Sequence, residues 1–247
     1  MKTLEYDLGP CVRAFTTTHA VDARRTNPMP LARLTGLSPE LIIIPHQVHD
    51  IRCLLVDTPF MKLPQDHRTQ CLEGIDAVMT ALPNTLICIS TADCIPIIIY
   101  DKRHHAVAAI HAGWKGTVRR IAEHAFAQMQ ENFGTQGADS HAIIGPGISL
   151  ESFEVGDEVY ERFSDATFDM ESLARRFPTR DADTPSNTKW HIDLKLCNRQ
   201  QLEHIGIPAR HIYVSDICTM THPDFYSARR EGIGTGRNMT CIQLKLS

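Results

Sequence analysis

Cys94 and His111 are the two residues whose types and spacing most strongly suggest chemistry. An apolar run at residues 95–100 follows the cysteine, a charged turn spans residues 101–105, and a second apolar run over 106–110 ends at the histidine. Two apolar runs joined by a short polar turn are typical of a β-hairpin. If the runs pair, Cys94 and His111 lie beside each other at the open end of the hairpin.

His49, in the string Gln-Val-His at 47–49, is the third candidate. One thiolate and two imidazoles make a three-ligand set, and zinc sites that perform chemistry typically use three protein ligands and leave a fourth position open. Taken singly, a cysteine after a strand is by default a small buried hydrophobe, and a lone histidine is more often a surface residue. Together, and with glycines at 113 and 116 that permit a sharp turn after His111, the three residues predict a metal site.

Asp93 and Gln47 stand next to these residues, and each has two interpretations. Asp93 either acts as a general acid or base beside Cys94 or caps a turn. Gln47 faces either the same pocket as His49 or the opposite side, because alternate residues of an extended segment point in opposite directions. Both are candidate site residues, Asp93 as a catalytic group and Gln47 as a substrate contact.

A glycine-rich stretch at residues 232–236 lies between Arg229, Arg230 and Arg237. It is not a dinucleotide fingerprint, which needs a preceding strand and a following helix, and it lacks the Gly-Lys-Ser/Thr of a P-loop. The stretch is therefore either a simple hairpin loop or a loop that lines the substrate site. Guanidinium groups bind phosphate through two parallel hydrogen bonds, so the three arginines are candidate substrate contacts, although surface arginines are commoner.

Short sequence motifs follow one another along nearly the whole chain. They are Gln-Val-His at 47–49, Asp-Ala-Val-Met-Thr at 76–80, Thr-Ala-Asp-Cys-Ile-Pro at 91–96, His-Ala-Gly-Trp-Lys-Gly at 111–116, Ile-Gly-Pro-Gly-Ile at 144–148, Phe-Glu-Val-Gly at 153–156, His-Ile-Asp-Leu at 191–194, Cys-Thr at 218–219, Phe-Tyr-Ser at 225–227 and Thr-Gly-Arg at 235–237. In this order they resemble the multi-copper polyphenol oxidase (laccase-domain) family. The resemblance implies a purine nucleoside phosphorylase that also deaminates adenosine and cleaves methylthioadenosine. It also implies a catalytic zinc bound by His49, Cys94 and His111.

The first forty residues depart from the pattern of that family. Members usually carry Thr-Thr-Arg and then a longer glycine-containing segment, whereas this chain has Thr-Thr-His at 17–19 followed closely by Val-Asp-Ala-Arg-Arg at 21–25. The shortening alters part of the expected substrate pocket. Lys115 stands where members often have arginine, which keeps the charge but loses the bidentate geometry.

Adenosine, inosine, guanosine and methylthioadenosine are the expected substrates, with phosphate as the second partner and Zn²⁺ as the cofactor. Cu²⁺ is the alternative ion, because it outcompetes zinc at many nitrogen and sulfur sites. A copper-dependent polyphenol oxidase stays open as a function, although the chain has none of the repeated His-x-His motifs of multicopper laccases. A metal-free hydrolase with Cys94 as nucleophile and His111 as its base also stays open. So does a nucleoside-binding protein without turnover.

The composition of the 247 residues is that of an ordinary globular enzyme, with 43% hydrophobic and 22% charged residues. A net charge of −4 gives no electrostatic reason to expect nucleic acid or an anionic membrane as a partner. The start of the chain lacks the apolar core of a signal peptide, and no apolar run approaches the ~20 residues of a membrane span. The eight cysteines include no Cys-x-x-Cys pair. We therefore expect a cytoplasmic protein with reduced thiols, and the sequence does not predict its oligomeric state.

Strand-like runs dominate the chain, at residues 12–17, 41–45, 51–56, 77–80, 86–90, 95–100, 106–110, 142–144, 211–214 and 240–246. Apolar spacing predicts a helix over 117–133 that ends at Gly134, a second from Asp193 to 205 and a shorter one over 156–163. Residues 177–189, rich in Pro, Thr, Asp and Ser, are expected to form a loop. Hairpins outnumber strand–helix–strand units, so the predicted fold class is α+β, with mixed β-sheets and flanking helices in a layered single domain over residues 1–247.

Overall fold

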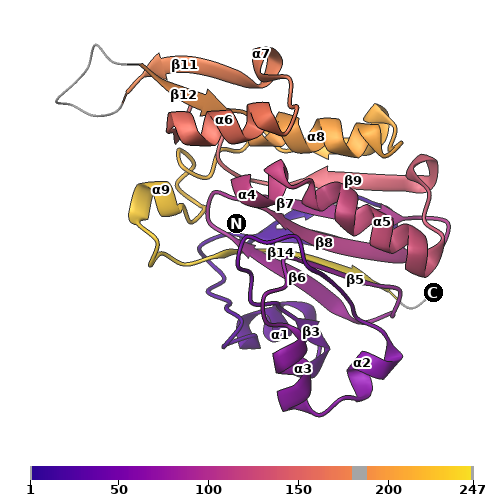
Figure 1. The fold of residues 1–247 in the computed structure, drawn as a ribbon. Coiled ribbons are helices and arrows are strands. Elements are labelled where there is room, and N and C mark those ends of the chain that lie inside the picture. The colour runs from indigo at the N-terminus through magenta and orange to yellow at the C-terminus, as the bar shows by residue number, and fades with distance from the viewer. Residues whose placement is uncertain (1, 180–187, 246–247) are drawn as a thin grey trace.

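A mixed sheet forms the centre of the computed structural model, which describes residues 2–179 and 188–245 (Figure 1). Across the sheet the strands are β13 (Ile212–Val214), β9 (Ser140–Ile144), β7 (Ile95–Asp101), β8 (Ala106–Ala112), β5 (Ala77–Thr80) and β4 (Cys53–Leu55). β7 and β8 form the predicted antiparallel hairpin, with Pro96 opposite His111. The outer pairs β13–β9 and β4–β5 are parallel, so the sheet is mixed as expected.

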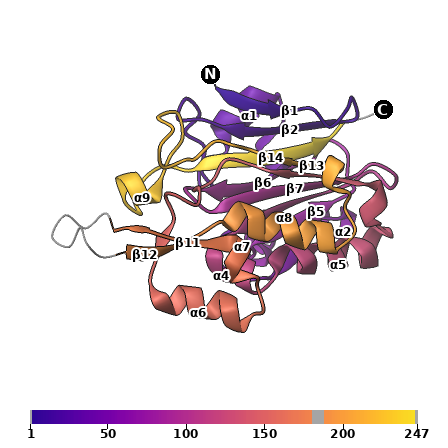
Figure 2. The ribbon, with the colours of Figure 1, turned by 90° about the horizontal axis from the view of Figure 1, so that it is seen from above.

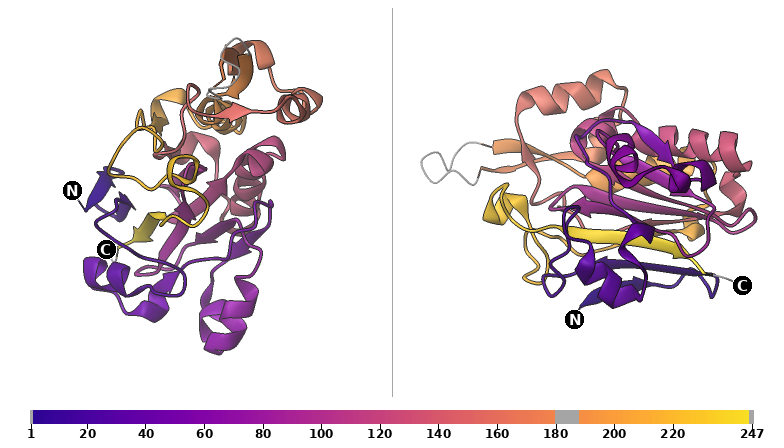
Figure 3. Two further views of the ribbon diagram at one scale, coloured as in Figure 1. Left: turned by 90° about the vertical axis from the view of Figure 1, so that its left-hand side faces the viewer. Right: turned by 90° about the horizontal axis from the view of Figure 1, so that it is seen from below.

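A second sheet packs against one face of the central sheet and joins the two ends of the chain. Its strands in order are β1 (Thr3–Tyr6), β2 (Val12–Thr17), β14 (Asn238–Leu244), β6 (Leu86–Thr91) and β3 (Ile42–Ile43). β14 is antiparallel to both of its neighbours, β2 and β6, and Figure 3 shows it running beside the N-terminal strands. The start of β6, at Leu86 and Ile87, is therefore held between the C-terminal strand and the short strand β3.

Alternating side chains of β7 pack into two separate hydrophobic cores. Ile97 and Ile99 pack with the helical layer, whereas Ile98 and Tyr100 pack against the second sheet. Residues that alternate along a strand point to opposite faces, so a strand buried on both faces reads as a continuous apolar run. This explains why residues 95–100 could be recognised as a strand from composition alone.

Helices cover the outer faces of both sheets. The outer face of the central sheet is covered by α5 (Ile121–Phe133) and α8 (Leu194–His204), which Figure 2 shows lying across the strands. The outer face of the second sheet is covered by α1 (Met29–Thr35), whose Leu31 packs in one cluster with Phe15 of β2. The layers are therefore helix, sheet, sheet and helix, and the predicted class of mixed sheets with flanking helices in one domain is confirmed.

A small third sheet lies beyond α8 (Figure 1). Its strands are β10 (Glu154–Val155), β12 (Thr188–Ile192) and β11 (Ala174–Pro178), with α6 (Asp157–Asp165) and α7 (Met170–Leu173) beside them. Phe163 and Ile192 belong to the same hydrophobic cluster as the central sheet, so this part shares the main core. The remaining helices are α2 (Thr58–Lys62), α3 (Gln65–Cys71), α4 (Trp114–Val118), α9 (Ala228–Glu231) and the 3₁₀ turns η1 (Pro39–Leu41), η2 (Gly137–Asp139) and η3 (Ala209–His211).

Two local predictions need correction. The helix predicted over 117–133 is two helices, α4 and α5, because Arg120 adopts a left-handed backbone with φ 58 and its guanidinium donates to Glu123 and lies over the ring of Phe168. The loop predicted over 177–189 is shorter, because its first two residues end β11 and its last two begin β12; residues 180–187 lie outside the described part. Among the described helices, none has both the length and the apolar character that a membrane crossing requires.

Candidate active site

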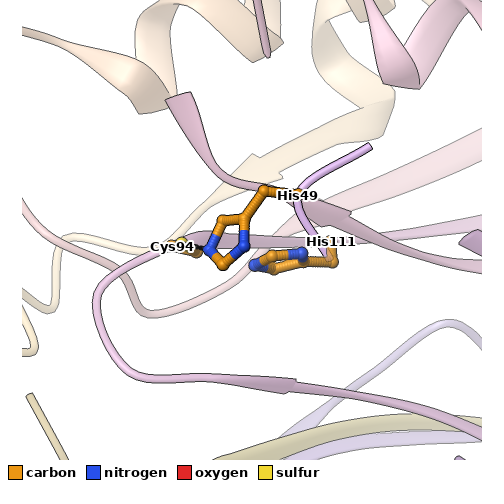
Figure 4. A group of neighbouring side chains, drawn as sticks. All are labelled: His49, Cys94 and His111. Atoms are coloured by element: carbon orange, nitrogen blue, oxygen red, sulfur yellow. Dashed lines mark hydrogen bonds between the residues drawn. The ribbon is translucent and has the colours of Figure 1, made fainter. Parts of the chain in front are cut away.

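His49, Cys94 and His111 come together at the open end of the β7–β8 hairpin (Figure 4). Their ligand atoms all lie within 4.8 Å of one another, and Cys94 Sγ is 3.7 Å from His49 Nε2. Cys94 directly precedes β7 and His111 stands near the end of β8, so the antiparallel register sets them side by side. His49 reaches them from the loop between β3 and β4. The structure thus brings together the three residues predicted as ligands.

Asp76, directly before β5, holds the ring of His111 and the backbone of His49. Its buried carboxylate accepts hydrogen bonds from three consecutive backbone N–H groups, those of Val48, His49 and Asp50, at 3.1, 3.0 and 3.0 Å. It also accepts a hydrogen bond from His111 Nδ1 at 2.7 Å. A histidine that donates one ring nitrogen to a carboxylate keeps the other nitrogen for a metal, so His111 presents Nε2 as its ligand atom.

The hydrogen bonds around Asp76 explain its pKa and the backbone conformation of His49. Burial by itself would raise the pKa of Asp76, but the hydrogen bond from His111, its charge and the bonds from the 48–50 loop lower that pKa. His49 has a left-handed backbone with φ 63, which is uncommon for a residue other than glycine. Its N–H bond to Asp76 holds that conformation, and the loop therefore presents the His49 ring from a fixed backbone.

Gly113 leaves space beside the three side chains. A Cβ atom at this position would lie 2.9 Å from His49 Cδ2 and 3.1 Å from Cys94 Sγ. The φ of Gly113 is −68, which any residue adopts, so the local crowding and not backbone freedom requires glycine here. The converging donor atoms of one thiolate and two imidazoles fit a zinc ion, and the same donor set also binds Cu²⁺.

Cys94 and His111 form an electrostatically coupled pair. Burial alone would raise the pKa of the Cys94 thiol, but the charge of His111 and hydrogen bonds from His111 and His49 lower it to about 6. Burial would lower the pKa of His111, yet the pairing with Cys94 and Asp76 raises it. The thiolate form of Cys94 is therefore favoured at neutral pH, and both metal binding and nucleophilic attack require that form.

A cavity of about 780 Å³ opens over the three residues. Its walls come from residues 24–26, from the loop and strand ends at 45–49 and 90–94, and from residues 228–237. Within the described residues the lining includes three arginines, Arg24, Arg25 and Arg237, and no aspartate or glutamate. The volume is in the usual range for small-molecule sites, and the lining favours an anionic ligand.

Gln47 lines this cavity together with His49, so the two side chains share one side of the loop. Its amide is already paired with Ser90 at the end of β6. Gln47 Nε2 donates to the Ser90 carbonyl at 2.8 Å, and Oε1 accepts from the Ser90 N–H and hydroxyl at 2.8 and 3.0 Å. The side chain therefore ties the His49 loop to β6 as well as facing the cavity.

Arg237 is the predicted arginine that lines the cavity. Its guanidinium donates to the backbone carbonyls of Ile233, Thr235 and Gly236 at 3.0, 2.6 and 2.9 Å. These bonds fix the side chain inside its own loop without neutralising its charge. The glycine-rich stretch also lines the cavity, which favours the second of the two predicted interpretations for this loop.

Arg229 and Arg230 lie outside the cavity lining of the described residues. Arg229 Nη1 donates to the Glu154 carbonyl at 3.0 Å, and Arg230 Nη1 donates to the carbonyls of Thr219 and Met220, each at 2.9 Å. Both side chains therefore join α9 to neighbouring segments.

Asp93 has its carboxylate fully engaged away from the cavity. Oδ1 accepts from the Thr219 hydroxyl at 2.7 Å, and Oδ2 accepts from the Ser227 hydroxyl and the Arg229 N–H at 3.0 and 2.7 Å. Asp93 is buried, has φ 91 and is absent from the cavity lining. These hydrogen bonds favour the second predicted role of Asp93, in which its carboxylate caps a turn, over a role as general acid or base.

No role was predicted from the sequence for Asp76, Arg24 or Arg25, and Gly113 was predicted only to permit a sharp turn after His111. A signal for Asp76 was present, since a carboxylate directly before a buried strand must find partners inside the protein. The consecutive arginines at 24–25 were noted only as part of the shortened N-terminal segment. Their place in the cavity depends on contacts with the C-terminal part of the chain.

A sequence model described as multi-copper polyphenol oxidoreductase laccase matches residues 14–245. The chain belongs to this family. It is 45% identical over 214 residues to the purine nucleoside phosphorylase of Bacteroides thetaiotaomicron, covering 85% of this chain and 77% of the relative. It is 39% identical over 229 residues to adenosine deaminase RL5 from an unknown prokaryotic organism, covering 91% and 82%. Relatives named for two purine reactions support an enzyme of purine metabolism.

Solved structures of similar fold agree with the family membership. The Bacillus licheniformis protein YfiH superposes with a TM-score of 0.81 at 28% identity, covering 95% of this chain and 93% of that protein. YlmD from Geobacillus stearothermophilus superposes with a TM-score of 0.79 at 27% identity, covering 96% and 93%. The predicted family is thereby confirmed, since sequence and fold both agree over nearly the whole chain.

Proposed function

We propose that this protein is a zinc-dependent purine nucleoside phosphorylase that also deaminates adenosine. The similarity to a purine nucleoside phosphorylase and to adenosine deaminase RL5 supports the substrate class. The observation that carries the proposal is the convergence of His49, Cys94 and His111 within 4.8 Å at one side of a cationic cavity. The substrates would be adenosine, inosine, guanosine and methylthioadenosine, with inorganic phosphate as co-substrate.

His49, Cys94 and His111 would hold the zinc, which supplies a Lewis acid next to the cavity. The hydrogen bond to Asp76 keeps the proton of His111 on Nδ1, so Nε2 would bind the ion, and Cys94 would contribute its thiolate. In phosphorolysis, phosphate attacks C1′ of the ribose and the purine leaves with a proton. In deamination, water attacks C6 of adenine and ammonia leaves.

Arg237 is the residue that we propose for binding inorganic phosphate. Arg237 lines the cavity and keeps its positive charge, and a charge-assisted hydrogen bond to an anion is stronger than one between neutral groups. Gln47 would position the His49 loop and contact the substrate. Asp93, Arg229 and Arg230 would act as positioning residues that hold α9 and the loop that follows it.

A metal-free Cys–His hydrolase is the second candidate, and one observation favours it. The lowered pKa of Cys94 beside His111 is also what a cysteine nucleophile paired with a base requires. A copper-dependent phenol oxidase is the third candidate, because the same donor set accepts Cu²⁺. Metal content and oxygen uptake with a phenol as substrate separate the third candidate from the first.

The Cys94→Ser variant separates the first two candidates. If Cys94 is a ligand, the variant loses zinc, phosphorolysis and deamination together, because serine is a poor zinc ligand and both reactions use one metal. Cys218→Ser is the matched control, since Cys218 is a buried cysteine of lowered pKa that does not line the described cavity; it should keep all three properties. Phosphorolysis that persists in Cys94→Ser after zinc is lost, or in chelator-treated wild-type protein, would refute the zinc mechanism.

A further inference from the structure

The positive charge of the cavity comes from two separate parts of the chain. Arg237 belongs to the C-terminal loop, whereas Arg24 and Arg25 belong to the shortened N-terminal segment. The whole protein has a net charge of −4, so three arginines in one cavity without a lining carboxylate are a local reversal of charge. The carboxylates that pair with Arg24 and Arg25 do not line the cavity, so the lining itself favours anions.

Contacts between the two segments place these arginines on adjoining walls. The His19 N–H donates to the Asp224 carbonyl at 2.9 Å, and the rings of His19 and Tyr226 have centroids 4.3 Å apart. Gly236 leaves the space that the Tyr226 ring occupies, because a Cβ there would lie 2.3 Å from Cζ of the ring. The segment that carries Arg24 is thus docked on the loop that carries Arg237.

The acidic partners of Arg24 and Arg25 are exposed and easily exchanged. Arg24 Nε is 3.2 Å from Asp22 Oδ1, with side chains 56% and 61% exposed. Arg25 Nη1 is 2.8 Å from Glu73 Oε1, with side chains 34% and 46% exposed. Exposed ion pairs of this kind contribute little to stability, so a phosphate can replace either carboxylate at small cost.

We propose that Arg24 and Arg25 bind a phosphate ester carried by the nucleoside itself, which makes nucleoside 5′-monophosphates ligands of this cavity. The inference rests on the proposed function, in which Arg237 takes inorganic phosphate. The two arginines on a different wall then suit a second phosphate, one that stays at the far end of the ribose from C1′. The volume of about 780 Å³ is ample for a nucleotide and a phosphate ion together.

Phosphorolysis of such a ligand balances without an added reagent. The bond from C1′ to the purine nitrogen breaks, a bond from C1′ to a phosphate oxygen forms, and the purine leaves with a proton. The product from adenosine 5′-monophosphate would be ribose 1,5-bisphosphate and adenine. No atom changes oxidation state overall, and the 5′-phosphate serves only as a binding group.

The test compares adenosine with adenosine 5′-monophosphate on the zinc-loaded protein by calorimetry. We expect the monophosphate to bind about tenfold more tightly at low salt, with an advantage that shrinks as ionic strength rises. In the double variant Arg24→Gln/Arg25→Gln the two ligands should bind equally, because the groups that recognise the 5′-phosphate are gone. The control is Arg103→Gln/Arg199→Gln, which removes the same charge from exposed ion pairs outside the described cavity.

Three results would overturn the inference: equal binding of the two ligands by wild-type protein, an advantage that survives in the double variant, or a raised KM for inorganic phosphate with the advantage intact. The last result would make Arg24 and Arg25 the site of inorganic phosphate. Failure of the proposed function is distinguishable, because it would appear as absence of phosphorolysis of every nucleoside, whereas the binding comparison is made without turnover.

Discussion

The two sides of the cavity are built differently. The metal side, formed by His49, Cys94 and His111 with Asp76 behind them, is fixed by strand register and by a fully buried carboxylate. The cationic side, formed by Arg24, Arg25 and Arg237, is carried on loops.

Exposure separates the most buried metal-side residue from the N-terminal arginines, although His49 is itself exposed and Arg237 is half-buried. His111 is only 3% exposed, whereas the Arg24 side chain is 56% exposed and bonds to an exposed aspartate. A group that must hold reacting atoms needs rigid support, and recognition of a charged substituent tolerates a looser one. The difference indicates that residues held by the strands determine the type of reaction. Residues on the loops determine which substrate is preferred. Substitutions on the two sides should therefore have effects of different kinds.

The largest effect is expected from Asp76→Asn. The variant loses the charge that orients His111 and the 48–50 loop, and changes to such an outer carboxylate typically lower metal affinity by about 10- to 100-fold. Chelator competition measures this affinity. Asp101→Asn is the matched control, because Asp101 is equally buried and also accepts two backbone N–H groups and one histidine ring. Equal zinc affinities in the two variants would contradict the role given to Asp76.

A smaller loss is expected from Gly113→Ala. The added methyl group lies too close to His49 and Cys94, and overpacking of this kind typically costs about 1–3 kcal/mol. If the cost falls on the metal-bound arrangement, zinc affinity drops by roughly tenfold. Gly234→Ala adds the same methyl group in open space on the opposite side of the cavity and should bind zinc normally. Unchanged zinc affinity in Gly113→Ala would show that the space beside the ligands is not needed.

Much of the metal side could be predicted from the sequence, because its signals are local. The apolar runs around residues 101–105 predict the hairpin, and the hairpin alone brings Cys94 next to His111. His49 was a candidate because an imidazole completes a three-ligand set, and the family resemblance implied the same ligand. The role of Asp76 could not be predicted, since its hydrogen bond to His111 joins residues 35 positions apart.

The cationic side was harder to predict for the same physical reason. The docking of residues 19–25 depends on the Tyr226 ring and on the space at Gly236, which lie at the other end of the chain. The three arginines around the glycine-rich stretch looked alike in sequence. Only the tertiary contacts separate Arg237, which lines the cavity, from Arg229 and Arg230, whose guanidinium groups donate to backbone carbonyls elsewhere.

On the cationic side, Arg237→Gln should raise the KM for inorganic phosphate by roughly fivefold, about 1 kcal/mol, through loss of a charge-assisted hydrogen bond. Deamination does not use phosphate and should be spared. Arg237→Lys keeps the charge but not the planar fork, so its KM should fall between the two. A loss of deamination equal to the loss of phosphorolysis would mean that Arg237 supports the fold of the loop and not the phosphate.

The smallest expected effect is on the pH dependence of Cys94 alkylation in the metal-free protein. His111 lowers the pKa of Cys94 to about 6, so the thiolate fraction, and with it the rate of alkylation by iodoacetamide, should rise with pH through about 6 and then level off. An ordinary thiol would show this rise near pH ~8.5. Mass spectrometry of the Cys94 peptide follows the reaction, and added zinc should suppress it. A midpoint near pH ~8.5 would contradict the coupling of Cys94 to His111.

X-ray absorption spectroscopy at the zinc edge tests the three-ligand site most directly. The zinc-loaded protein should show one sulfur neighbour at about 2.3 Å, two imidazole nitrogens at about 2.0–2.1 Å and one further light atom from solvent or phosphate. Addition of phosphate should change only that last neighbour. A zinc shell without sulfur, or one closed by four protein ligands, would contradict a catalytic zinc held by His49, Cys94 and His111.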